Sequence, residues 1–133
     1  MDKFLLTGPC KVEGKIDVSG SKNAALPILA ATLLFDKPVE LKNLPNVRDI
    51  QTMLALLKSL GSKIVISRNK KSVKIYNFKK MKTFASYNLV KTMRAGILVL
   101  GPLLARFGNA KVSFPGGCNL GQRKIDIHLN ALS

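Results

Sequence analysis

The sequence predicts a mixed α/β domain built from one unit of helices and strands that occurs twice. Apolar residues recur at helical spacing in some segments and alternate as in β-strands in others. These segments follow one another in the same order in both copies, since residues 29–41 align with 100–112 and residues 50–57 with 125–132. A length of 133 residues, of which 47% are hydrophobic, suits a single domain with a folded core.

The first copy covers about residues 22–77 and is expected to contain two helices and three strands. The expected helices are 23–35 and 47–60, and the expected strands are 39–44, 63–67 and 72–76. Apolar residues of the second helix lie three and four positions apart, and Gly61 follows them as a helix stop. The polar turn between the last two strands favours a hairpin.

The second copy covers about residues 87–133. Its expected elements are a helical run over 89–107 that breaks or kinks at Gly101-Pro102, a strand over 111–114 and a helix from near Lys124. Ser133 falls inside that last helix, so we expect an incomplete chain, an N-terminal fragment whose final helix leaves an apolar face uncovered. A shorter natural relative with a frayed last helix is the alternative.

Basic residues dominate the charge. Lysine and arginine number 22 against 7 aspartates and glutamates, which gives a net charge of +15 with the histidine neutral. Such a charge favours an anionic partner, either nucleic acid or a phosphorylated small molecule, although a solvated basic surface is the simpler interpretation. Nucleic acid is the less favoured partner, because stacking proteins interleave aromatic and basic residues and this chain has no Trp and 2 Tyr.

Composition also excludes several classes of protein. No apolar run approaches the ~20 residues that cross a bilayer, and the N-terminus lacks the basic and apolar regions of a secretory signal. The 2 cysteines and the single histidine lie far apart, so no metal site is expected. The expected location is the cytoplasm.

Residues 19–27 form the first of three segments with candidate functional residues. Lys22 and Asn23 stand at the start of the expected helix, because Pro27 is tolerated only in or near its first turn. Backbone N–H groups, the positive end of the helix dipole and the Lys22 ammonium together suit a phosphate or carboxylate. The alternative is that Asn23 only caps the helix and Lys22 is only solvated.

Residues 114–123 form the second segment, a glycine-rich loop that holds Cys118. The loop is not a phosphate-binding P-loop, because Gln122 and Arg123 stand where that motif has Lys and then Ser or Thr. A thiol exposed in such a loop is expected to be reactive, and Arg123 is placed to bind an anion beside it. Cys10 stands between two expected strands, 3–7 and 11–18, and is interpreted as structural.

Residues 87–95 form the third segment, in which Lys91 and Arg94 lie three positions apart at the front of a helix. Two cations on one helix face repel each other unless an anion lies between them. An anion-binding position is therefore one interpretation, and a plain basic helix face is the other. His128 corresponds to Met53 of the first copy and is expected to pack at the edge of the core.

The three segments together resemble the UDP-N-acetylglucosamine enolpyruvyl transferases, also called UDP-N-acetylglucosamine 1-carboxyvinyltransferases. The matching stretches are SGSKNAALPI at 19–28, LVKTMRA at 89–95 and PGGCNLGQR at 115–123. The resemblance covers the whole chain, although the family enzyme is several times longer. It implies an inside-out α/β barrel of repeated βαβαββ-like units. Residues 1–21 would begin one domain, completed by C-terminal sequence absent here, and residues 22–133 would supply part of a second domain with the catalytic loop.

The resemblance also implies an activity, the transfer of the enolpyruvyl group from phosphoenolpyruvate to the 3′-hydroxyl of UDP-N-acetylglucosamine with release of phosphate. This is the first committed step of bacterial cell wall (peptidoglycan) synthesis and the target of fosfomycin. Lys22 and Asn23 would bind phosphoenolpyruvate, and Cys118 would be catalytic and protonate its C3 carbon. The residues implied to bind the UDP-sugar are Arg94, Arg123, Lys124, Ile125, Asp126 and Ile127. No cofactor and no membrane partner is implied.

Two departures from the family pattern qualify this expectation. Lys124 stands where the family usually has proline, so the sugar-nucleotide pocket is expected to differ in shape. A further catalytic aspartate and arginine of the family fall outside this chain, so the chain alone is expected to be inactive. The nearest alternative is the sister enzyme that acts on shikimate 3-phosphate, which lacks the loop cysteine, and a basic nucleic-acid-binding module is the alternative from another class.

Overall fold

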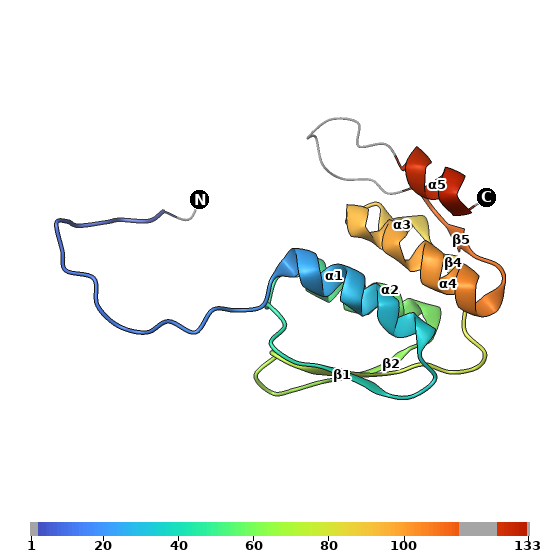
Figure 1. The fold of residues 1–133 in the computed structure, drawn as a ribbon, viewed down its shortest axis with the longest axis horizontal. Helices are drawn as coiled ribbons and strands as arrows, with labels where there is room; N and C mark the ends of the chain where they lie inside the picture. The colour runs from blue at the N-terminus through green and yellow to red at the C-terminus, as the bar shows by residue number, and fades with distance from the viewer. Residues whose placement is uncertain (1–2, 115–124, 133) are drawn as a thin grey trace.

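Helices α1 (Lys22–Ala31) and α2 (Arg48–Leu60) lie side by side on one face of a three-stranded antiparallel sheet in the computed structural model (Figure 1). The structure describes residues 3–114 and 125–132. The strands of this sheet, in spatial order, are β1 (Val39–Leu41), β3 (Val73–Tyr76) and β2 (Lys63–Ile66). The predicted hairpin is confirmed, because β2 and β3 pair antiparallel.

Helix α2 buries one broad face in the core, whereas Gln51, Ala55 and Lys58 on its opposite face are exposed. Its buried residues are Ile50, Met53, Leu54, Leu56, Leu57 and Leu60. Burial of each such side chain contributes about 1.5–3 kcal/mol. Gly61 ends the helix at φ 112°, a left-handed conformation that glycine adopts without a steric penalty, and the predicted helix stop is thereby confirmed.

The rest of the chain adds helices and a short pair of strands on the other side of α1 from the sheet (Figure 1). These elements are β4 (Phe84–Ala85), α3 (Tyr87–Val90), the 3₁₀-helix η2 (Arg94–Val99), α4 (Leu100–Phe107), β5 (Lys111–Val112) and α5 (Asp126–Leu132). The predicted order of helix, strand and helix in the second copy is confirmed. The parallel pairing of β4 with β5 was not predicted.

The helical run expected over residues 89–107 has an interruption that was not predicted. The dipeptide 101–102 lies in the first turn of α4, where a proline needs no N–H partner. The interruption lies between Val90 and Arg94, where Met93 is extended with φ −149° and ψ 116°. At Gly101-Pro102 the predicted break is present only as a change of helix type, from the 3₁₀-helix η2 to the α-helix α4 at Leu100.

Residues 3–21 form an exposed arm in place of the two strands expected at 3–7 and 11–18 (Figure 1). Its large apolar side chains are between 83% and 96% exposed, namely Phe4, Leu5, Leu6, Val12, Ile16 and Val18. A strand needs a neighbour for its backbone N–H and C=O groups, and no segment in the described ranges pairs with the arm. Cys10 is exposed on this arm, and its interpretation as a structural residue stays a prediction.

The arm joins α1 through a close backbone contact at Gly20. A Cβ atom at this position would lie 1.9 Å from the carbonyl oxygen of Asn43, so any larger residue would force the chain apart. Ser21 follows as the N-cap of α1, and its hydroxyl accepts a hydrogen bond from the N–H of Ala24 at 3.4 Å. Lys22 is consequently the first residue of the helix, one position earlier than predicted.

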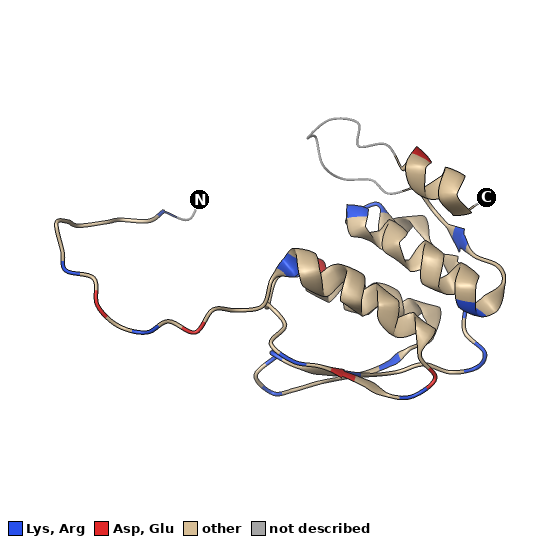
Figure 2. Ribbon diagram, in the orientation of Figure 1, with Lys and Arg blue, Asp and Glu red and all other residues tan. Residues whose placement is uncertain are grey.

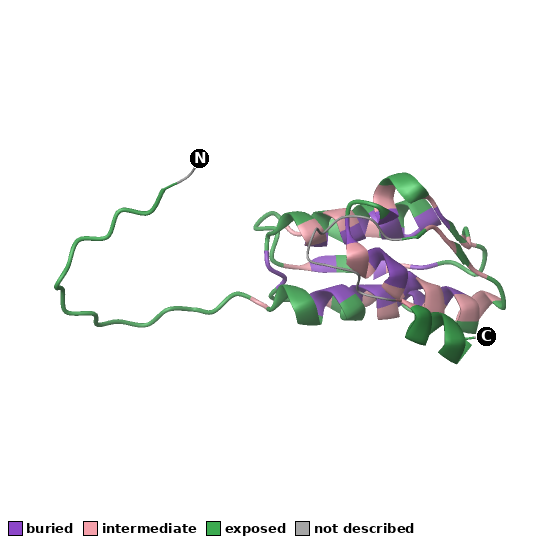
Figure 3. Cartoon of the chain, turned by 90° about the horizontal axis from the view of Figure 1, so that it is seen from above, coloured by how far each residue is buried: buried purple, intermediate pink, exposed green. Residues whose placement is uncertain are grey.

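Buried residues gather where the helices face one another and the sheet, whereas α5 is exposed along its length (Figure 3). The apolar residues of α5 are 76% exposed at Ile127, 40% at Leu129 and 42% at Leu132. The expectation that the last helix exposes an apolar face is confirmed.

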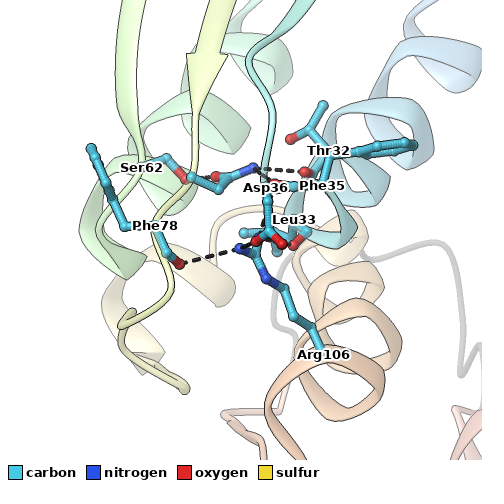
Figure 4. Close-up of polar contacts among 8 residues, drawn as sticks. Thr32, Leu33, Phe35, Asp36, Ser62, Phe78 and Arg106 are labelled. Atoms are coloured by element: carbon cyan, nitrogen blue, oxygen red, sulfur yellow. Dashed lines mark hydrogen bonds and ion pairs between the residues drawn. The ribbon is translucent and has the colours of Figure 1, made fainter.

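The end of the first helical segment is fixed by a buried amide. The 3₁₀-helix η1 (Thr32–Leu34) continues α1. The carbonyl oxygen of Thr32 accepts a hydrogen bond from the N–H of Phe35 at 3.1 Å, and further donors to this helix end come from outside the helix. The Asn77 side chain donates to the carbonyl oxygen of Thr32 at 2.6 Å and to that of Phe35 at 3.5 Å. Its own amide oxygen accepts a hydrogen bond from the Ser62 hydroxyl at 2.7 Å, so the buried amide is satisfied on both sides (Figure 4).

Arg106 of α4 provides further donors for the same carbonyl groups (Figure 4). Its guanidinium donates to the carbonyl oxygens of Leu33 at 2.6 Å, Phe35 at 3.0 Å and Phe78 at 3.3 Å, and it forms an ion pair with Asp36. The arginine side chain is only 11% exposed. Arg106 therefore ties the second copy of the repeat to the end of the first helical segment and to the chain after β3.

We predict that Arg106→Lys lowers the free energy of unfolding by about 1.5–3 kcal/mol, because an ammonium lacks the planar fork that reaches several carbonyl groups. Urea unfolding followed by circular dichroism measures the change. Arg68→Lys, in the exposed hairpin turn, is the matched control and should change the same free energy by less than about 0.5 kcal/mol. Equal losses in the two variants would contradict this role of Arg106.

Candidate functional site

A pocket of about 380 Å³ opens where the start of α1, the start of α2, the chain around η2 and α5 meet. We call it the Lys22 pocket. Its lining residues are Lys22, Asn23, Leu26, Asp49, Thr92, Met93, Arg94, Ala95, Ile97, Leu98, Ile125 and His128. Residues that are far apart in the sequence thus form one concave surface.

The floor of the Lys22 pocket is apolar and its rim is polar. Leu26, Met93 and Ile97 are buried, at 5%, 4% and 8% exposure. The cations on the rim are Lys22, at the positive end of the α1 dipole, and the half-buried Arg94. Such a surface suits a ligand that combines an anionic group with an organic body.

The Lys22 ammonium is held by a carboxylate of the neighbouring helix. Its Nζ lies 2.8 Å from Oδ2 of Asp49, and the two side chains are 46% and 36% exposed. Asp49 lies in the first turn of α2, where an acidic residue also interacts favourably with the helix dipole. The start of α1 and the start of α2 are thereby linked at the edge of the pocket.

The structure brings together only part of the predicted site. Predicted site residues that line the Lys22 pocket are Lys22, Asn23, Arg94 and Ile125. Asp126 and Ile127 begin α5 but do not line this pocket. The remaining predicted site residues, Cys118, Arg123 and Lys124, lie outside the described residues.

Lys91 and His128 differ from their expected positions. Lys91 follows α3 as its C-cap, with Nζ 5.2 Å from the centre of the Tyr87 ring, and it does not line the pocket with Arg94. The interruption of the helix explains this, because the two cations no longer share one helix face. His128 is exposed and lines the pocket, so the expectation of packing at the edge of the core was wrong.

Asp49 is the functional candidate that sequence analysis missed. An aspartate in the first turn of a helix is common for reasons of stability alone, and the sequence contains no sign that Lys22 lies beside it. Asp49 can be recognised as a site residue only from the proximity of the starts of α1 and α2. That proximity follows from tertiary packing and is not visible in the spacing of the residues.

Basic segments are spread over the arm, the hairpin and the helix ends and do not gather on one face in this view (Figure 2). None of the helices in the described ranges is long and apolar enough to span a bilayer. Within residues 3–114 and 125–132, no three His, Cys, Asp or Glu side chains form a group that could hold a metal ion. The Lys22 pocket is therefore the feature of the described chain to which the sequence motifs point.

Comparison with known sequences connects the whole chain to one group of enzymes. The sequence model of the EPSP synthase (3-phosphoshikimate 1-carboxyvinyltransferase) family matches residues 6–133. The chain is 65% identical over 133 residues to the UDP-N-acetylglucosamine 1-carboxyvinyltransferase of Pelagibacter ubique, and 54% identical over 132 residues to that of Acinetobacter baylyi. These matches cover 100% and 99% of this chain but only 31% of each relative, so the chain spans about a third of their length.

Comparison with solved structures confirms the expected fold. The chain is similar to the enolpyruvyl transferase NikO from Streptomyces tendae with a TM-score of 0.65 and 18% sequence identity. The match covers 74% of this chain and 22% of NikO.

We predict that inorganic phosphate binds in the Lys22 pocket and shifts the backbone NMR signals of residues 22–24 and 92–95. Lys22→Met should weaken this binding by about 10- to 100-fold, because a charge-assisted hydrogen bond is worth about 1.5–3 kcal/mol. Lys58→Met, which removes an exposed cation from the other end of α2, is the control and should change the affinity little. Equal weakening by both variants would indicate attraction by the overall charge and not by the pocket.

Proposed function

The chain belongs to the EPSP synthase family of enolpyruvyl transferases, and we propose that it supplies substrate-binding and catalytic residues of a UDP-N-acetylglucosamine enolpyruvyl transferase. The observation that carries the proposal is the 65% identity to the Pelagibacter ubique relative of that name over 133 residues. The proposed reaction joins phosphoenolpyruvate to the sugar nucleotide in the cytoplasm of a bacterium and begins peptidoglycan synthesis. Fosfomycin would inhibit it.

Both proposed substrates are polyanions, and the cations of the Lys22 pocket support their binding. Lys22 and Asn23 would hold phosphoenolpyruvate at the start of α1, where the helix dipole favours a negative charge. Arg94, on the same pocket, would contact the UDP-sugar together with Ile125 and the residues on either side of it. We assign Arg123, Lys124, Asp126 and Ile127 to the same ligand.

Cys118 is the proposed general acid. The 3′-hydroxyl oxygen would form a bond to C2 of phosphoenolpyruvate and give its proton to a base outside this chain, while C3 gains a proton from the thiol, which becomes a thiolate. The thiolate would then take a proton back from C3 as phosphate leaves C2 with the electron pair of the C–O bond, which restores the double bond as an enol ether. The anionic phosphate would remain beside cations in both steps, which lowers the cost of the charge that develops on it.

We further propose that residues 1–21 belong to a different domain from residues 22–133, in which the repeats are about 22–77 and 87–133. The exposed arm supports this division, because its apolar side chains lie away from the core of the described chain. In the proposed enzyme, strands from the remaining length of the protein would pair with the arm.

The shikimate 3-phosphate enzyme is the second candidate, because its name describes the family model that matches residues 6–133. Two observations favour the sugar nucleotide. The relatives at 65% and 54% identity carry the name of the UDP-N-acetylglucosamine enzyme, and the glycine-rich loop contains Cys118.

We predict that a chimera, in which residues 1–133 replace the matching segment of the Pelagibacter ubique relative, releases phosphate from phosphoenolpyruvate only when UDP-N-acetylglucosamine is present. The 133-residue chain alone should release none, because it spans 31% of that relative and the proposed site takes residues from the remainder. A phosphate-release assay measures both. Turnover with shikimate 3-phosphate in place of the sugar nucleotide would favour the second candidate, and turnover by the chain alone would contradict the division of the site.

In the same chimera, substitution of Arg123 should affect substrate binding, whereas substitution of Cys118 should affect the chemical step. Arg123→Lys keeps the charge but loses the planar fork, so the affinity for UDP-N-acetylglucosamine should fall about 10- to 100-fold. Cys118→Ser should abolish the chemical step and leave that affinity nearly unchanged. Calorimetric titration of the sugar nucleotide into both variants is the measurement, and equal losses of affinity would mean that the two roles are assigned wrongly.

A further inference from the structure

The ion pair between Lys22 and Asp49 places a negative charge on the rim of a pocket that otherwise presents cations to an anion. Nζ of Lys22 lies 2.8 Å from Oδ2 of Asp49, and both residues line the Lys22 pocket. A carboxylate at this position opposes the attraction of an anion. Its presence on the rim therefore indicates a task other than attraction.

We propose that Asp49 is a positioning residue, which holds the Lys22 ammonium in the orientation required for the transfer reaction. This inference rests on the proposed function. Asp49 does not contact the reacting atoms in the proposed scheme and acts through Lys22 alone.

The Asp49 side chain has less conformational freedom than the Lys22 side chain, so Asp49 can position Lys22. A lysine carries its charge on a flexible stem of four carbons and loses much rotamer entropy when it is fixed. Asp49 has a short side chain on α2, whose next residues, Ile50 and Met53, are buried in the core at 4% and 0% exposure. The rigid helix thus provides an anchor for a lysine side chain that is 46% exposed.

A positioning role has a kinetic signature. Removal of the Asp49 charge makes the pocket more positive, so the KM for phosphoenolpyruvate should stay the same or fall. The ammonium then loses its fixed orientation in the transition state, so kcat should fall by about 10- to 100-fold. A decrease in kcat without an increase in KM is the expected result for Asp49→Asn in the chimera.

Stabilisation of α2 is the competing explanation for Asp49, since acidic residues in a first helical turn interact with the helix dipole. The double variant Asp49→Asn, Gln51→Glu returns a carboxylate to the start of α2 at a residue that does not line the Lys22 pocket. A structural role predicts that this variant recovers both the free energy of unfolding and kcat. A positioning role predicts recovery of the former only.

Further variants complete the kinetic test. Asp49→Glu keeps the charge and should retain more of kcat than Asp49→Asn does. Glu40→Gln is the matched control, because it removes a carboxylate that pairs with Lys42 at 3.8 Å outside the pocket, and it should leave kcat unchanged. An Asp49→Asn value of kcat within about twofold of the parent, or its recovery in the double variant, would overturn the proposal.

A second measurement on the 133-residue chain does not depend on turnover. NMR relaxation of the Lys22 side-chain CεH₂ group should show a lower order parameter in Asp49→Asn, and the exposed Lys58 should show no change. An unchanged order parameter at Lys22 would overturn the proposal. An inactive parent chimera would contradict the proposed function, whereas this measurement would still decide the effect of Asp49 on Lys22.

Discussion

The carbonyl groups that end the α1–η1 segment impose the constraint on which the arrangement of the chain depends. They lie at the junction of both copies of the repeat, from the buried Thr32 and Leu33 to the exposed Phe35, and a buried carbonyl oxygen without a donor would be costly. Donors from distant parts of the sequence satisfy them, Asn77 after the sheet and Arg106 from α4. These bonds fix α4 against η1. Since η2 leads directly into α4, they also fix the segment that carries Arg94 beside the start of α1.

Local patterns in the sequence predicted the elements that depend on turn residues or on a single apolar face. Helix α2, its stop at Gly61 and the hairpin followed from periodicity and turn residues, and the repeat predicted the order of elements. Strands were predicted for the arm because its apolar residues alternate. Alternation indicates that one face of a segment is apolar, but it does not show that a neighbouring strand is present to pair with it. The interruption before Arg94 was not predicted, because no glycine or proline between Val90 and Arg94 marks it in the sequence.

The candidate site could be predicted only where its residues lie in recognisable motifs. Lys22, Asn23 and Arg94 stood in such motifs, and the structure brings them to one pocket. Asp49 and His128 reach the same pocket through tertiary packing, and their immediate neighbours in the sequence gave no sign of it. Site residues that lie on a helix or strand outside the motifs are therefore the hardest to predict from the sequence.

The contact between Gly20 and the carbonyl oxygen of Asn43 has a consequence for the geometry of the whole protein. An extended chain covers ~3.3–3.6 Å per residue, so the arm that leaves this contact can reach up to about 60 Å. Because the arm is this long, a small change in backbone direction at Gly20 displaces the other end of the arm by a large distance. The backbone at position 20 therefore determines the direction in which the arm leaves α1. Even one added methyl group at this position would change that direction.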